Sequence, residues 1–258
     1  MNLELTGKNV LITGGSKGIG LACAHAFIAE GARVALISRS EANLAAAGAA
    51  LGAPLAVAAD LADAAAAARA VERVERELGP LDVLVNSAGA ARRTPPDELT
   101  PDAWRAAMDA KYFTYVNVID PVVKRMAGRG RGVIINIVGS GGKVAMPIHL
   151  PGGAANAALM LATVGLAQVY APKGVRVLAI NPGLTNTTRV GEGLRAEARL
   201  SGISEEEALR RTVERIPIGR LAEPEEIANV AVFAASPRAS YLTGVVIGMD
   251  GASLPVVV

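Results

Sequence analysis

Short apolar runs alternate with longer segments of helical periodicity along most of the chain. The apolar runs show no regular polar alternation, as expected for strands that are buried on both faces. The pattern predicts strands at Asn9–Thr13, Arg33–Ser38, Pro54–Ala59, Leu81–Asn86, Gly132–Val138, Val175–Ile180 and Val245–Gly248. It predicts helices at Ile19–Glu30, Glu41–Leu51, Ala62–Leu78, Pro101–Met126, Ala154–Tyr170 and Pro224–Ala235.

This repeated strand–helix alternation predicts an α/β fold. Crossover helices place successive strands in parallel, and right-handed crossovers give a Rossmann-type doubly wound sheet of seven strands with helices on both faces. We find no linker or break in composition, so residues 1–258 are predicted to form one Rossmann-type domain. Residues 188–215 depart from the alternation, because they are polar and rich in Glu and Arg. We expect an irregular substrate loop or lid there, with pocket contacts from Glu192, Arg195, Leu200 and Ile203.

Composition narrows the possible partners. The 258 residues carry a net charge of only +2 and no concentrated basic segment, which argues against nucleic-acid binding. The single cysteine, Cys23, excludes an internal disulfide and favours a reducing, cytoplasmic location. The uncharged stretch from Val144 to Pro172 is interrupted by prolines and glycines, so we expect a buried helix rather than a membrane span. We expect neither a membrane nor a metal partner.

A glycine-rich turn follows the first predicted strand. Its residues are Thr13-Gly14-Gly15-Ser16-Lys17-Gly18-Ile19-Gly20, and a helix begins within it. Glycines at such a turn let backbone N–H groups approach a pyrophosphate and let the helix pack against the strand. The helix N-terminus adds a partial positive charge. The turn therefore predicts a dinucleotide site.

The spacing of this turn resembles that of the short-chain dehydrogenase/reductase (SDR) family. Further motifs match in order: Asp60-Leu61, Asn86-Ser87-Ala88-Gly89, Asn181-Pro182-Gly183 with Thr187 beyond, and the tail residues 216–220, 242–244 and 250–251. The resemblance covers the whole chain and implies an oxidoreductase that binds a nicotinamide cofactor. It implies cofactor contacts from Gly14, Ser16, Lys17, Gly18, Ile19, Gly20, Ser38, Arg39, Asp60, Leu61, Asn86, Ala88, Gly89, Pro182, Gly183, Thr185 and Thr187.

The end of the second strand bears on cofactor choice. NAD enzymes usually place an acidic residue there, to bind the ribose 2′-hydroxyl. This chain has Ser38 followed by Arg39, and Lys17 lies in the glycine turn. Two cations attract a 2′-phosphate, so we expect NADP(H) rather than NAD(H).

The family's acid/base residues are missing from their usual positions. The resemblance implies a catalytic Tyr-x-x-x-Lys motif, yet none of the four tyrosines is followed by lysine at that spacing. The neighbouring motifs place Gly152 at the tyrosine position and Asn156 at the lysine position. The family's serine position falls on Gly139, with Ser140 next to it, and its helical asparagine is replaced by Lys111.

Three interpretations remain open. In the first, the protein is an oxidoreductase with substitute chemistry. Lys111, Ser140, Lys143 and His149 are expected to reach the pocket, and Lys111, Ser140 and His149 are the candidate catalytic residues. In the second, it binds NADP(H) without catalysis, as a sensor or partner subunit. In the third, it is a dehydratase or isomerase on the same scaffold. The first ranks highest, because the residues that the resemblance assigns to nicotinamide binding remain.

We expect a small-molecule substrate and a homo-oligomer. The uncharged helix Ala154–Tyr170 carries the small residues Ala155, Ala158, Ala162 and Gly165, which allow close packing against another helix. The resemblance implies a dimer or tetramer built on this helix, with a second interface at the C-terminal strand. The apolar tail, residues 254–258, favours burial in such an assembly.

Overall fold

The structure is a computed structural model that describes residues 1–89 and 91–256, with the side chains of residues 192, 196 and 200 outside the description. Within this part of the chain, one parallel sheet has the strand order β3-β2-β1-β4-β5-β6-β7. Its strands are β1 Asn9–Thr13, β2 Arg33–Ser38, β3 Leu55–Ala58, β4 Val83–Asn86, β5 Gly132–Ile137, β6 Val175–Pro182 and β7 Val246–Met249. The strands β1 to β3 extend in one direction from the middle of the sheet, and β4 to β7 extend in the other, starting beside β1. This is the arrangement of a doubly wound sheet, so the predicted fold class is confirmed.

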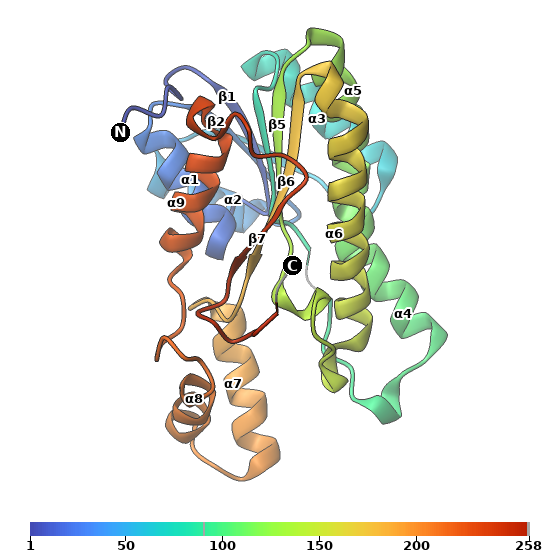
Figure 1. Ribbon diagram of the computed structural model, residues 1–258, viewed down its shortest axis with the longest axis vertical. Coiled ribbons are helices and arrows are strands. Elements are labelled where there is room, and N and C mark those ends of the chain that lie inside the picture. Colours follow the sequence, from blue (N-terminus) through green and yellow to red (C-terminus); the bar gives the residue numbers. More distant parts are fainter. Residues whose placement is uncertain (90, 257–258) are drawn as a thin grey trace.

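Helices cover both faces of the sheet (Figure 1). One face carries α1 Gly18–Ala29, α2 Glu41–Leu51 and α9 Pro224–Ala235, and the other carries α3 Ala64–Leu78, α5 Thr114–Arg129 and α6 Leu150–Tyr170. Two apolar cores result, one on each face. The central strands are buried throughout, which explains their continuous apolar sequences.

The predicted helix Pro101–Met126 is divided into three parts. A short α4, Pro101–Ala107, leads into a π-helical turn at Met108–Phe113, and α5 follows directly. A π turn contains an extra residue, which changes the direction of the side chains around it. In this protein the turn includes Lys111, whose side chain is buried.

The expectation of an irregular segment at residues 188–215 is wrong. The chain there forms two helices, α7 Thr188–Ser201 and α8 Glu205–Glu214. Figure 1 shows them together at the lower end of the molecule, away from the layers that cover the sheet.

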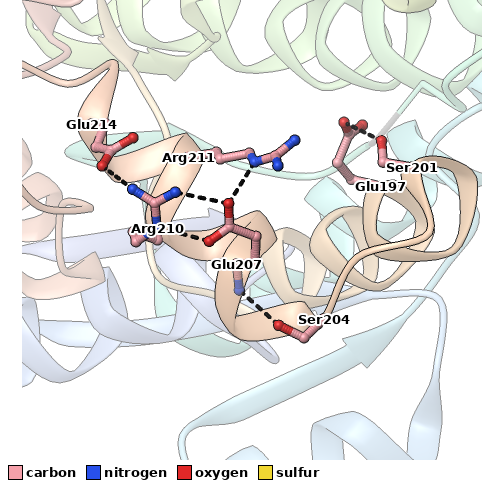
Figure 2. A network of polar contacts seen from close by, with 7 residues as sticks. All are labelled: Glu197, Ser201, Ser204, Glu207, Arg210, Arg211 and Glu214. Atoms are coloured by element: carbon pink, nitrogen blue, oxygen red, sulfur yellow. Dashed lines mark hydrogen bonds and ion pairs between the residues drawn. The ribbon is translucent and has the colours of Figure 1, made fainter.

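Local polar contacts explain why this charged segment is helical (Figure 2). The Ser204 hydroxyl accepts a hydrogen bond from the Glu207 N–H at 3.1 Å and so caps α8. Glu207 binds Arg210 and Arg211, three and four residues later, each at 2.7 Å, and Arg210 also contacts Glu214. The Ser-x-x-Glu spacing is a signal for the start of a helix. The sequence interpretation overlooked it because it considered only the charge composition of this segment.

The apolar segment predicted to be a buried helix forms α6. Pro147–Lys173 is long and apolar enough to span a membrane by length and composition alone, with 44% of its most apolar window buried. Ala155, Leu159, Thr163 and Ala167 are buried on the side that packs on the sheet. The segment is therefore a core helix, as its sequence predicts.

Candidate active site

A cavity of about 650 Å³ lies at the carboxyl ends of the first strands. Twelve of the predicted cofactor residues line it: Gly14, Ser16, Lys17, Gly18, Ile19, Ser38, Arg39, Asp60, Leu61, Ala88, Gly89 and Thr187. They come from five separate sequence segments. The fold thus brings together residues that the sequence pattern had grouped by motif alone. We refer to this space as the nucleotide cavity.

Two glycines beside the nucleotide cavity leave no room for a side chain. A Cβ on Gly14, which has φ of +66°, would lie 2.8 Å from the backbone of Ala88. A Cβ on Gly20 would lie 2.3 Å from the carbonyl oxygen of Gly14. The turn can therefore bring its backbone against β4 and α1 against the turn, as pyrophosphate binding requires.

The first turn of α1 is open to an anion. Lys17 is the N-cap residue of α1, and its side chain makes no capping hydrogen bond. The free N–H groups of a helix start bind phosphate oxygens. This cradle fits the pyrophosphate of a dinucleotide.

The end of β2 offers hydroxyl and cationic groups to the nucleotide cavity. Ser16 Oγ donates a hydrogen bond to Ser38 Oγ at 2.9 Å, and the residues that follow the two serines in sequence, Lys17 and Arg39, also line the cavity. Asp60, from the end of β3, also lines the cavity and accepts a bond from the Ala62 N–H at 3.1 Å.

Five predicted cofactor residues lie elsewhere. Gly20 packs α1 onto the turn, and Thr185 is buried with its hydroxyl 3.3 Å from the Gly183 carbonyl oxygen. Pro182 and Gly183 line a second cavity, described below. Asn86 is fully buried in a polar ladder.

That ladder ties the carboxyl ends of the central strands to α6. Thr13 Oγ1 lies 3.3 Å from Asn86 Oδ1, and Asn86 Nδ2 donates to Asn136 Oδ1 at 3.0 Å. Asn136 Nδ2 donates in turn to Thr163 Oγ1 at 3.0 Å. In this network each buried side-chain amide has a hydrogen-bond partner. Asn86 therefore helps to fix the carboxyl ends of the central strands, from which the site is built.

A second cavity, of about 530 Å³, adjoins the nucleotide cavity, and Gly89 and Arg189 line both. We call it the substrate-side cavity. Its lining includes all three candidate catalytic residues and the expected positions of the family's tyrosine and lysine, namely Lys111, Ser140, His149, Gly152 and Asn156. Lys143 lines neither cavity. Among the described residues, no group of three His, Cys, Asp or Glu side chains is placed to hold a metal ion.

The imidazole of His149 fills the space in front of Gly152. A Cβ on Gly152 would lie 2.2 Å from Cε1 and 2.4 Å from Nε2 of His149. His149 precedes α6 as its N-cap residue, so its ring lies over the first turn of the helix. The ring can occupy this place only because residue 152 has no side chain.

The environment of His149 favours the neutral ring. Burial lowers its pKa below the ordinary 6.5, and the cations Arg189, Arg93 and Lys111 lower that pKa further. Nδ1 is buried and has no hydrogen-bond partner among the described residues. A histidine with a lowered pKa is mostly neutral at neutral pH, and its protonated form is a stronger acid than an ordinary imidazolium.

Lys111 is a buried amine at the inner end of the substrate-side cavity. Its Nζ donates to Tyr115 Oη at 2.8 Å and to the Ile137 carbonyl oxygen at 3.0 Å. Tyr115 donates to the same carbonyl oxygen at 2.5 Å. Burial, with the charge of Arg189, lowers the pKa of Lys111 from 10.5 to about 7.

Backbone geometry brings Ser140 to the substrate-side cavity. Gly139, with φ of +140°, ends the extension of β5, and its N–H donates to Asn181 Oδ1 at 3.0 Å. A Cβ on Gly139 would lie 3.1 Å from Asn156 Nδ2, so the side chain of Asn156 extends from α6 to this turn. Ser140 begins the short helix η3, Ser140–Gly142, and its hydroxyl can polarise a carbonyl.

Sequence reasoning missed three arginines of the site. Arg189, in the first turn of α7, lines both cavities, and its Nη2 donates to the Ala91 carbonyl oxygen at 3.0 Å. Arg92 and Arg93 line the substrate-side cavity from the loop after β4. Their position three and four residues after the Asn-Ser-Ala-Gly motif was the available signal.

Two of the four pocket residues expected from 188–215 lie outside this site. Arg195 and Ile203 line neither cavity. The side chains of Glu192 and Leu200 lie outside the described residues.

Comparison with known proteins identifies the family. A family model described as enoyl-(acyl carrier protein) reductase matches residues 14–252. An acetoacetyl-CoA reductase from Shinella zoogloeoides is 36% identical over 241 residues, covering 93% of this chain and 96% of the relative. The structure of L-sorbose reductase from Gluconobacter frateurii, complexed with NADPH and L-sorbose, has a TM-score of 0.93 with 32% identity and full coverage of both chains.

A further solved structure bears on the site. It is an NADPH-bound short-chain oxidoreductase from Pseudomonas aeruginosa PAO1 containing an atypical catalytic center, with a TM-score of 0.88 and 31% identity. The match covers 97% of this chain and 98% of the chain in that structure. The motifs, the sheet order and these similarities agree, and the chain belongs to the short-chain dehydrogenase/reductase family.

Proposed function

We propose that the protein is an NADP(H)-dependent oxidoreductase that interconverts a carbonyl compound and an alcohol through a non-standard active site, in which His149 is the acid/base group. The observation that carries this proposal is the position of the His149 ring. It takes the space that a side chain on Gly152 would need, in a cavity that opens to the nucleotide cavity.

The nicotinamide, when bound, supplies or accepts the hydride at the carbonyl carbon. In reduction, protonated His149 gives its proton to the carbonyl oxygen as the alcohol forms. In oxidation, the neutral ring removes the hydroxyl proton. Such a positioned acid or base contributes about 10²–10⁴ to the rate.

Two neighbours support His149. Ser140 donates its hydroxyl hydrogen to the carbonyl oxygen and so fixes the orientation of the substrate. Lys111 acts through charge, because its ammonium form lowers the pKa of His149. We propose Lys111 as a positioning and tuning residue, held by Tyr115 and Ile137.

NADP(H) is proposed over NAD(H) because of the groups at the end of β2. Lys17, Ser38 and Arg39 all line the nucleotide cavity, and this set of groups suits a 2′-phosphate. Solved relatives carry NADPH, which agrees with this preference. The other residues of the nucleotide cavity are proposed to hold the pyrophosphate, adenine and nicotinamide parts.

The proposal is tested with purified protein in two steps. NADPH binding is measured from cofactor fluorescence, and NADPH oxidation is then followed with a panel of aldehydes and ketones. The proposal expects binding and carbonyl-dependent oxidation. Binding without turnover of any substrate would instead favour the non-catalytic NADP(H)-binding protein.

We also propose a homo-oligomer built on the outer face of α6. Leu161 and Val169 on this helix are 76% and 57% exposed. Light scattering should give a dimer or tetramer mass, and Leu161→Asp should lower it. A monomeric wild type would contradict this part of the proposal. The reducing, cytoplasmic location expected from the lone Cys23 stays a prediction.

A further inference from the structure

Cationic side chains dominate the charge of the substrate-side cavity. Arg92, Arg93 and Arg189 line it together with Lys111 and His149. None of the described side chains that line it is a carboxylate. A cavity lined by one sign of charge concentrates ligands of the opposite sign.

Arg93 is the cation best placed to bind an anion in this cavity. Arg92 lies 3.6 Å from Glu98, and Arg189 donates to the Ala91 carbonyl oxygen. Arg93, in contrast, makes no hydrogen bond or ion pair with any residue that the structure describes. Its guanidinium can therefore offer its N–H groups to a ligand.

The surroundings hold Arg93 over the cavity. The N–H of the next residue, Thr94, donates to the Ile148 carbonyl oxygen at 2.9 Å, which ties this loop to the segment that carries His149. The guanidinium lies against α7 at Gly193, where an added Cβ would be 3.2 Å from both Nη1 and Nη2. Arg93 also lowers the pKa of His149, so its charge acts at the proposed acid/base group.

We infer that the substrate is a carbonyl compound that carries an anionic group, a carboxylate or a phosphate, and that Arg93 binds this group while the carbonyl lies at His149 and Ser140. A guanidinium binds such oxyanions through two parallel hydrogen bonds. Met146, Leu184 and Val190 add apolar lining, which suits a short hydrocarbon part. The inference rests on the proposed function, because it assigns the substrate of that same site.

Matched pairs of carbonyl compounds test the inference. Levulinate is compared with methyl levulinate, acetoacetate with methyl acetoacetate, and dihydroxyacetone phosphate with dihydroxyacetone. For each compound, kcat/KM is measured with NADPH, and Kd for the NADP⁺ complex is measured by calorimetry. The levulinate and acetoacetate pairs test for recognition of a carboxylate, and the dihydroxyacetone phosphate pair tests for recognition of a phosphate.

The anionic member of at least one pair should be preferred by about 10- to 100-fold, the range of a charge-assisted hydrogen bond. Arg93→Gln should remove the preference, and Arg93→Lys should restore part of it. Arg73→Gln is the charge-matched control, because Arg73 lies on the exposed side of α3 in a pair with Glu77. This control should keep the preference.

Three results would overturn the inference. They are equal use of the charged and neutral members by the wild type, a preference that survives in Arg93→Gln, and a loss of NADPH binding in Arg93→Gln as large as the loss of substrate binding. If no compound is turned over, the proposed function fails, and calorimetry still decides the inference. Binding of an anionic probe that depends on Arg93 supports it, and absence of such binding contradicts it.

Discussion

The ring of His149 and the missing side chain of Gly152 share one space. Two ring atoms of His149 lie within 2.4 Å of the point where a Cβ on Gly152 would stand. The glycine that the resemblance places at the family's tyrosine position is thus the residue that admits the imidazole. We interpret the pair as one substitution of an acid/base group, with the histidine supplied from the residue before α6.

Gly152→Ala tests this relationship. Alanine is the better helix former by about 1 kcal/mol, so the variant should be at least as stable as the wild type in thermal unfolding. Its Cβ must push the ring away, and reductase activity should fall by about 10²–10⁴. Gly48→Ala, on α2, is the control, because a Cβ at Gly48 meets nothing within 4 Å. Full activity in Gly152→Ala would contradict a catalytic role for the observed ring position.

The pH dependence should follow His149 with opposite signs in the two directions. Reduction needs the protonated ring, so kcat/KM should fall as pH rises through a pKa below 6.5. Oxidation needs the neutral ring, so its kcat/KM should rise through the same pKa. The profiles are measured between about pH 5 and 8 with NADPH and NADP⁺. Two profiles of the same sign would contradict the assignment.

Lys111 should make the folded protein more stable as pH rises. The folded pKa is about 7 against an ordinary 10.5, so between these values the unfolded chain binds a proton that the folded chain has released. Stability should therefore rise between about pH 7 and 9, by on the order of 2 kcal/mol from this group. In Lys111→Met, the free energy of unfolding measured with denaturant should not show this part of the increase with pH.

The control for that measurement is Lys124→Met. Lys124 is exposed and bound to Asp120, which raises its pKa, so its removal should leave the slope in this pH range unchanged. Equal slopes for the wild type and Lys111→Met would show that the buried amine keeps an ordinary pKa.

Arg39 should control the choice between the two cofactors. Arg39→Leu removes a cation from the nucleotide cavity, so the ratio of NADPH to NADH affinity should fall by about 10- to 100-fold. Fluorescence titration with both cofactors measures it. Arg33→Leu, at the exposed start of the same strand, is the matched control. An unchanged affinity ratio in Arg39→Leu would show that Arg39 does not bind the 2′-phosphate.

The sheet was predictable because its signal is local. Buried parallel strands such as β1 and β4 are continuous apolar runs, and the glycine turn marks the first crossover. The helix α8 was missed because the interpretation of residues 188–215 rested on their polar composition and not on the i,i+3 and i,i+4 spacing of charges such as Glu207–Arg210 and Glu207–Arg211.

The site was predictable only in part. Sequence spacing predicted that Gly152 and Asn156 stand at the family's tyrosine and lysine positions, and both residues line the substrate-side cavity. It did not predict that the ring of His149 would fill the space, because that depends on the path of η4, Pro147–His149, into α6. The positions of Arg93 and Arg189 depend on contacts between the loop after β4 and α7, which lie far apart in sequence.

The most direct test of the central claim compares His149→Gln with His25→Gln. The chain has two histidines, and His25 is exposed on α1, away from both cavities. We predict that His149→Gln keeps NADPH affinity and loses about 10²–10⁴ in kcat, while His25→Gln keeps both. Carbonyl-dependent NADPH oxidation at the wild-type rate in His149→Gln would contradict the account.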